Sequence, residues 1–215
     1  VWANIPGQSF SGQVWLEVGL NVPIVSYSPS LYTYTKNTTI STIVPTNTGG
    51  EVTTWAINGS LPSGLSFGTS NGSIWGTPDT ITASTTYTVW ANNSAGSGST
   101  TITLTVNDVA PSITFTPSSL ILATGAAMTP ITASNSGGTI VSCSVSPSLP
   151  SGLSLSNTCT LSGTPTVARS ALTYTITATN TGGSDTATFS LTVQASGGTL
   201  TITPTSPKGS VNSAL

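Results

Sequence analysis

Residues 61–66 read Leu-Pro-Ser-Gly-Leu-Ser, and residues 149–154 repeat the same six letters 88 positions later. In such a turn proline fixes one φ angle and glycine accepts a positive φ, so the two leucines can return toward one core. The alternative, a Gly-rich anion cradle, needs a helix start and a basic residue nearby, and the sequence around this turn has neither. The repeated turn therefore indicates two copies of one folding unit.

Other landmarks keep nearly the same spacing on both sides of this turn. Upstream landmarks recur at an offset of 88 and downstream landmarks at 87: 23–29 with 111–117, 47–50 with 135–138, and 76–78 with 163–165. The change of offset places a one-residue deletion between Leu65 and Ile74. That stretch is rich in Gly, Ser and Asn, as expected of a surface loop that tolerates deletion.

Within each copy the apolar residues alternate with Thr or Ser, as in Ile102, Leu104 and Val106. A period of two is typical of half-buried strands, and Thr suits the outer face because it favours strands and stays hydrated. Gly-Gly and Ala-Gly turns separate the runs at short intervals, and no stretch has a helical period. The pattern predicts an all-β chain with two tandem Ig-like antiparallel β-sandwich domains.

The domain boundaries follow from the repeat. We expect Ig-like repeat 1 at residues 23–108 and Ig-like repeat 2 at 109–195, with extra strand segments at both ends of the chain. Residues 1–22 contain an orphan final strand that matches residues 102–106, with Val14, Leu16 and Val18 as its apolar positions. It is either a donor strand for exchange with a neighbour or the end of a preceding repeat. Residues 196–215 resemble the start of a third repeat or form a tail.

The composition excludes several functions. Charged residues make up 4% of the chain, the formal net charge is −2, and there is no histidine. Three basic residues provide no footprint for nucleic acid or anionic lipid, and no apolar run is long enough for membrane insertion in this segment. Without histidine or a visible carboxylate pair we expect no enzyme and no cofactor. A neutral hydroxyl-rich surface suits an extracellular or cell-surface location.

The repeated motifs resemble the immunoglobulin-like, or cadherin-like, domains found in tandem on bacterial and archaeal surface proteins. The resemblance rests on Leu-Pro-Ser-Gly-Leu, on the following Gly-Thr-Pro at 76–78 and 163–165, and on the closing Tyr-x-(Val/Ile) strands at Tyr87 and Tyr174. Together these motifs cover about 170 residues, in order and at near-constant distance. The resemblance implies a sandwich used as a spacer or adhesion module, and it implies no defined ligand.

The two cysteines, Cys143 and Cys159, are 16 positions apart, which permits a single disulfide; two buried thiols are the alternative. Cys143 falls at the position of Trp55 in the first repeat, and Cys159 falls near Gly72. One repeat thus has a cross-link where the other has a large aromatic. We expect Trp55, together with Trp75 and Trp90, to stabilise the first repeat by burial of apolar area.

Two further kinds of site are suggested by short motifs. Four Asn-x-Ser/Thr sequons occur, all in the first repeat, and mark candidate glycosylation sites; they begin at Asn37, Asn58, Asn71 and Asn92. The hydroxyls could also carry O-linked sugars. The junction at Asp108 is similar to the calcium-binding linkers between cadherin repeats, but Asp108 has no acidic companion nearby, so a rigid metal-free linker is favoured.

These observations favour a structural or adhesive repeat of an extracellular surface fibre, filament or stalk protein. The expected partners are copies of the same chain or other surface and fibre proteins, and glycans are a further candidate. Two alternatives stay open. One is a glycan-binding module in which Trp2, Trp15 or Trp90 stacks on sugars, and the other is a spacer domain attached to a larger surface protein or enzyme.

Overall fold

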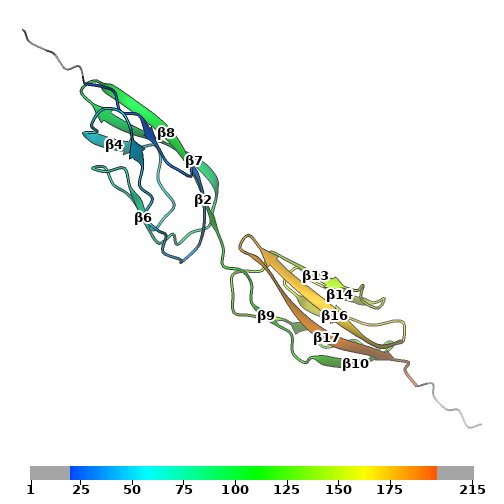
Figure 1. The fold of residues 1–215 in the computed structure, drawn as a ribbon. Coiled ribbons are helices and arrows are strands. Elements are labelled where there is room, and N and C mark those ends of the chain that lie inside the picture. The colour runs from blue at the N-terminus through cyan, green and yellow to red at the C-terminus, as the bar shows by residue number, and fades with distance from the viewer. Residues whose placement is uncertain (1–19, 198–215) are drawn as a thin grey trace, which may run out of the picture. The chain divides into compact units, whose positions relative to one another are not determined.

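The computed structural model describes residues 20–197, and it divides into two compact units between Asp108 and Val109. Every regular element in this described range is a β-strand (Figure 1). The predicted fold class is confirmed: each unit is an Ig-like sandwich built from its own strands. The candidate strand at Val14, Leu16 and Val18, and the segment after residue 197, lie outside the described residues.

The first domain consists of two layers. One layer is the four-stranded sheet β2-β8-β7-β4, and the other contains the pairs β1-β3 and β5-β6, joined by a bridge between Ile43 and Ile74. The strands are β1 (Val25–Ser26), β2 (Leu31–Thr35), β3 (Thr46–Asn47), β4 (Thr54–Ile57), β5 (Leu65–Phe67), β6 (Ile74–Gly76), β7 (Thr82–Asn93) and β8 (Gly96–Asn107).

The second domain repeats this plan. Its large sheet is β10-β17-β16-β13, and its other layer contains β11-β15-β14 and the pair β12-β9. The strands are β9 (Ile113–Thr114), β10 (Ser119–Ala123), β11 (Ile131–Thr132), β12 (Ser134–Asn135), β13 (Ser142–Ser146), β14 (Leu153–Leu155), β15 (Thr160–Gly163), β16 (Arg169–Asn180) and β17 (Gly183–Gln194).

One strand pair in each domain runs parallel, which the antiparallel expectation did not include. Strand β2 pairs with β8 in parallel, and β10 pairs with β17 in the same way. The reason is that the chain crosses between layers after β1 and after β9, so the next strand arrives beside the closing strand from the same direction. The closing strands β8 and β17 therefore each have a neighbour on both sides.

The alternation read from the sequence decides what is buried. Along β8 the side chains of Ile102, Leu104 and Val106 are fully buried, whereas the threonines between them face outward. Strand β17 behaves alike, with Phe189 and Leu191 inside. Each domain consequently has its own apolar core between the inner face of the large sheet and the second layer, while the outer face of that sheet is rich in hydroxyl groups.

The Leu-Pro-Ser-Gly-Leu turn has the role predicted for it. Gly64 has φ +86°, and the Leu65 amide donates to the Pro62 carbonyl oxygen at 3.0 Å. The Thr77 amide donates to the Gly64 carbonyl oxygen at 3.0 Å, and a Cβ on Gly64 would lie 1.9 Å from the Thr77 carbonyl oxygen. The turn and the following Gly-Thr-Pro motif therefore interlock, and only glycine fits there.

The repeated Asn-x-Gly-Gly motif is a structural cap. The Asn47 side-chain oxygen accepts hydrogen bonds from the amides of Ile24 (3.1 Å) and Gly49 (3.0 Å), and its nitrogen donates to the Gly50 carbonyl oxygen at 2.7 Å. In the second domain Asn135 makes the same three contacts, with Ser112, Gly137 and Gly138. The asparagines of these motifs hold strand ends in place, so their repetition needs no functional explanation.

Candidate functional site

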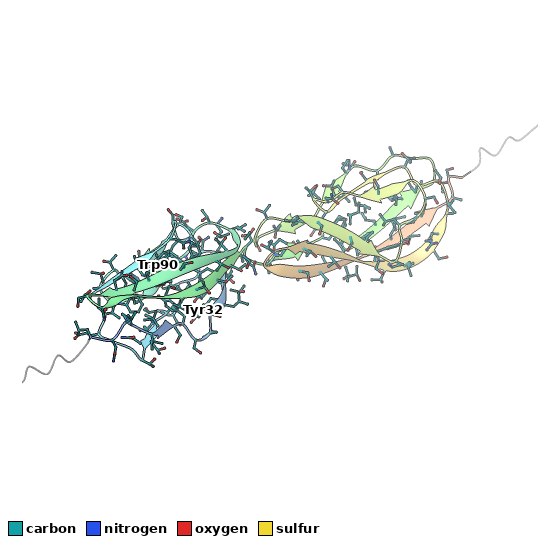
Figure 2. The ribbon with its side chains drawn as sticks, turned by 90° about the horizontal axis from the view of Figure 1, so that it is seen from above. Tyr32 and Trp90 are labelled. Atoms are coloured by element: carbon teal, nitrogen blue, oxygen red, sulfur yellow. A yellow bond between two sulfur atoms is a disulfide. The ribbon has the colours of Figure 1, made fainter. Side chains whose placement is uncertain are left out.

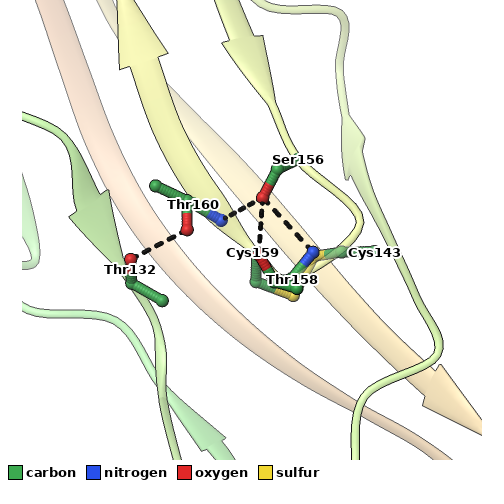
Figure 3. Close-up of a disulfide and its surroundings, with 6 residues drawn as sticks. All are labelled: Thr132, Cys143, Ser156, Thr158, Cys159 and Thr160. Atoms are coloured by element: carbon green, nitrogen blue, oxygen red, sulfur yellow. Dashed lines mark hydrogen bonds between the residues drawn. A yellow bond between two sulfur atoms is a disulfide. The ribbon is translucent and has the colours of Figure 1, made fainter.

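The disulfide region is the most distinctive chemistry of the described residues. Cys143 lies in β13, and Cys159 lies in the turn before β15 (Figure 3). The two sulfur atoms are bonded, with Cα atoms 5.3 Å apart, and Cys159 is fully buried. The bridge connects the edge strand of the large sheet to the opposite layer. Because both cysteines are used in it, the described chain has no free thiol.

The turn that presents Cys159 is closed by hydroxyl groups. The Ser156 hydroxyl oxygen accepts hydrogen bonds from the amides of Thr158 (3.2 Å) and Thr160 (3.1 Å), and the Thr132 and Thr160 hydroxyls lie 2.8 Å apart (Figure 3). Cys159 has φ +59°, a conformation unusual for a residue with a side chain. These contacts hold the residue in that conformation.

In the first domain the same positions hold Trp55 and Gly72. Trp55 is buried in β4, and Gly72 has φ +69° in the turn between β5 and β6. A Cβ on Gly72 would lie 2.6 Å from the Trp55 ring, so glycine is required for the indole to pack there. The sequence-based view that the cross-link and the aromatic are alternative solutions agrees with this geometry.

The carbonyl group at this position is satisfied differently in the two domains. In the second domain the Cys159 carbonyl oxygen accepts a hydrogen bond from the Ala133 amide at 3.1 Å. The residue equivalent to Ala133 is Pro45, which has no amide hydrogen. The Gly72 carbonyl oxygen instead accepts a hydrogen bond from the Tyr27 hydroxyl at 2.5 Å. Tyr27 stands where the second domain has Phe115.

Tyr27 belongs to a group of tyrosines that includes Tyr32 and Tyr34 of β2. Burial, and secondly the charge of Tyr32, raise the pKa of Tyr27, and the same causes raise the pKa of Tyr34 to about 12. Burial alone raises the pKa of Tyr32. The rings of Tyr32 and Tyr34 stack at 5.9 Å between centroids. These phenols stay neutral at physiological pH and serve the core; the equivalent side chains in the second domain are Phe115, Leu120 and Leu122.

The expectation that Trp75 and Trp90 join Trp55 in the core is wrong. Trp75 is 42% exposed on β6, and Trp90 is half-buried on the outer face of the large sheet (Figure 2). The reason is strand alternation: Trp75 follows the fully buried Ile74, and Trp90 lies between the buried Val89 and Ala91. Of the three aromatic residues proposed to stack on sugars, Trp2 and Trp15 lie outside the described residues.

The four sequon asparagines all lie at the surface of the first domain. Asn37, Asn58 and Asn71 are exposed, and Asn92 is half-buried near the end of β7. Asn37 has φ +61° at a turn, a conformation in which asparagine is favoured. The Asn71 side-chain oxygen accepts hydrogen bonds from the Ser73 amide (3.1 Å) and hydroxyl (2.7 Å), and Ser73 is buried.

The acidic groups are scattered. Asp108 is buried at the end of the first domain, and the Asp185 carboxylate accepts a hydrogen bond from the Ile113 amide at 2.7 Å, which holds β9. Residues 20–197 contain no group of three His, Cys, Asp or Glu side chains that could hold a metal ion. Within the same residues no helix is long and apolar enough to span a bilayer.

The geometry defines a class of protein: tandem Ig-like β-sandwiches with two separate cores. The sequence profile of the family described as "Putative Ig domain" matches residues 22–107 and 109–194. The chain belongs to this family, in two tandem copies, as the sequence motifs indicated. Domains of this kind are typically non-catalytic, and no catalytic family is detected in the chain. No curated protein matches the chain.

Two solved structures illustrate the likeness of fold. Drosophila OTK extracellular domains 3–5 are 14% identical with a TM-score of 0.50, over 79% of this chain and 62% of that chain. The N-terminal four Ig domains of Dscam1 isoform 9.44 are 16% identical with a TM-score of 0.51, over 82% and 47%. The chain therefore spans less than two thirds of both relatives. At such identities the likeness concerns the fold alone.

Proposed function

We propose that this chain is a structural or adhesive repeat of an extracellular fibre, filament or stalk. The observation that supports the proposal best is that each domain is a complete sandwich with its own core, while a single residue separates the two family matches. Each such repeat can fold as an independent unit, because its core is built from its own strands. A row of these repeats can therefore transmit mechanical force along a fibre.

The surface chemistry supports the same proposal. Outward-facing positions of β7, β8, β16 and β17 are mostly Thr and Ser, which stay hydrated without responding to pH or salt. A disulfide in the second domain suits an oxidising compartment. Copies of the chain, or other surface and fibre proteins, are the proposed partners, and the location is extracellular.

Strand exchange is a narrower form of this proposal. The closing strands β8 and β17 already lie between two neighbouring strands. An incoming strand could therefore pair with either of them only by displacing one of those neighbours. Residues Val14, Leu16 and Val18 of one copy would instead add to an edge strand of another, such as β4 or β13. Deletion of residues 1–19 would then abolish polymer formation while leaving both domains folded.

Electron microscopy of native cell-surface material, labelled with an antibody against residues 20–197, tests the fibre proposal. The expected result is regular label along filaments or stalks. Label confined to dispersed particles, with no polymer, would contradict it.

Glycan binding is the second candidate, because Trp75 is a large aromatic residue with 42% of its surface exposed. A glycan array probed with the native chain and with Trp75→Ala separates the two candidates. Specific binding that Trp75→Ala abolishes would favour a binding module, whereas equal and negligible signals would exclude it.

A further inference from the structure

Three features that distinguish the first domain lie on one sheet face. Asn58 follows β4, Asn92 and Trp90 belong to β7, and all three side chains lie on the outer face of the sheet β2-β8-β7-β4. The pairing sets Trp90 opposite Ala56 and Asn92 opposite Thr54, while the Asn58 amide donates to the Thr88 carbonyl oxygen. Position 90 therefore lies between the two asparagine positions on this face, and its Cα atom is about 7 Å from each of theirs.

The equivalent face of the second domain lacks all three. Ser146, Thr177 and Thr179 occupy the positions of Asn58, Trp90 and Asn92. Neither asparagine is needed to build the sandwich, since the second domain forms the same sheet with hydroxyl residues at these places. Asn37 and Asn71 differ, because a left-handed turn at Asn37 and the contacts with Ser73 at Asn71 explain them structurally.

The amide geometry at both sites suits modification. The Asn58 Oδ1 accepts a hydrogen bond from the Thr88 amide at 2.7 Å, and the Asn92 Oδ1 accepts one from the Ser97 hydroxyl at 2.5 Å. These contacts orient the side chains without using Nδ2, the atom that carries an N-linked sugar. Both sequon serines, Ser60 and Ser94, are exposed. A glycan on either asparagine thus leaves the observed contacts intact.

We propose that Asn58 and Asn92 are N-glycosylated and that the first sugar residues pack against the Trp90 indole. The donor would be an oligosaccharide linked to a polyprenyl phosphate. The Nδ2 atom attacks the anomeric carbon and loses one proton, a C–N bond forms, the C–O bond to phosphate breaks, and the phosphate leaves with the electron pair. No oxidant or reductant is needed. The half-buried indole offers an apolar face to the C–H groups of a sugar ring.

The inference rests on the extracellular location proposed above and can fail separately from it. The test is peptide mapping by mass spectrometry, with electron-transfer fragmentation, of protein isolated from its native source. The expected result is a sugar mass on Asn58 and on Asn92. Unmodified asparagines at both positions, or sugar at Asn37 or Asn71 alone, would overturn the inference; protein found unmodified on the cell surface would leave the fibre proposal standing.

Variants test the role of Trp90. In the native host, Ser60→Ala with Ser94→Ala should remove both sugar masses while keeping the asparagine contacts, and this double variant provides the unglycosylated reference. Trp90→Thr, which copies the residue at position 177, should keep both sugars. In the unmutated protein, packing on the indole should shift the NMR signals of the core sugar protons upfield, and the sugars should raise the melting temperature above that of the double variant. Trp90→Thr should abolish both effects. Unchanged shifts in Trp90→Thr would contradict packing of the sugars on the indole.

Discussion

The two domains close the same gap in the core with different chemistry. The second domain uses the Cys143–Cys159 bridge and an ordinary backbone hydrogen bond from Ala133. The first uses a buried indole at Trp55, a glycine beneath it, and a hydroxyl from Tyr27 that replaces the missing amide of Pro45. Each set of residues works only as a set, because changing one member leaves a clash, a cavity or an unsatisfied carbonyl group.

The comparison teaches that a repeat can keep its fold when a disulfide bond is replaced by a buried aromatic side chain. The bridge acts chiefly on the unfolded chain, whereas the indole acts through buried area. The first domain should therefore be indifferent to redox conditions and sensitive to side-chain volume at Trp55, whereas the second should be sensitive to reduction of its bridge. Tryptophan fluorescence separates the two, because residues 109–195 contain no tryptophan.

The largest effect is expected from Trp55→Ala. Removing a buried indole should lower the free energy of unfolding of the first domain by about 3–5 kcal/mol, because the Gly72 turn cannot fill the space. Hydrogen exchange measured separately on peptides from each domain checks this. Exchange in peptides from 109–195 should not change. The exposed Trp75→Ala serves as the control and should cost much less; equal losses for the two variants would contradict the packing account.

Removal of the disulfide comes next. Cys143→Ser with Cys159→Ser should destabilise the second domain by about 3 kcal/mol, the value expected for closing so short a loop. Chemical denaturation followed by far-UV circular dichroism measures the loss, and tryptophan fluorescence should report an unchanged first domain. A shift of both transitions together would show that the domains are not independent.

Alkaline pH should weaken the first domain. The pKa of Tyr27 is raised in the folded domain by burial and by Tyr32, so the hydroxyl stays neutral there above pH 10 while it ionises in the unfolded chain. Stability is therefore complete below pH 10 and falls as pH rises above it, by about 1 kcal/mol between pH 10 and 11 for Tyr27. Fluorescence-detected unfolding across this range checks the trend, and a midpoint that is constant from pH 9 to 11 would contradict it.

The smallest effect concerns the Tyr27 hydroxyl alone. Tyr27→Phe should cost the first domain about 1 kcal/mol, since the Gly72 carbonyl oxygen loses its donor. The reciprocal change, Phe115→Tyr, should bring no gain, because Ala133 already satisfies the Cys159 carbonyl oxygen. A double-mutant cycle with Pro45→Ala sharpens the test: restoring a backbone amide should reduce the cost of Tyr27→Phe. Additive costs would contradict the exchange of donors.

Much of the fold could be predicted from local pattern. The Leu-Pro-Ser-Gly-Leu turn, the alternation in β8 and the deletion between Leu65 and Ile74 all depend on residues near each other in the chain, and the structure contains each of them. The deletion lies in the turn between β14 and β15, which is one residue shorter than the equivalent turn between β5 and β6.

What the sequence could not provide depends on long-range geometry. The parallel pairing of β2 with β8 follows from a crossing between layers that leaves no periodic signal. The contact of Tyr27 with Gly72 spans 45 positions. The expectation that Trp75 and Trp90 are buried with Trp55 rests on residue type. Strict alternation from their neighbours Ile74 and Val89 would have placed both on the outer faces.

Single-molecule force spectroscopy on the native chain tests the central claim most directly, namely that two autonomous domains carry load and differ in how each core is closed. The account predicts two separate unfolding events under oxidising conditions. The extension released by the second domain should be shorter by about 50 Å, because the bridge withholds the 16-position loop, and this length should return on reduction. One concerted event, or extensions unaffected by reductant, would contradict it.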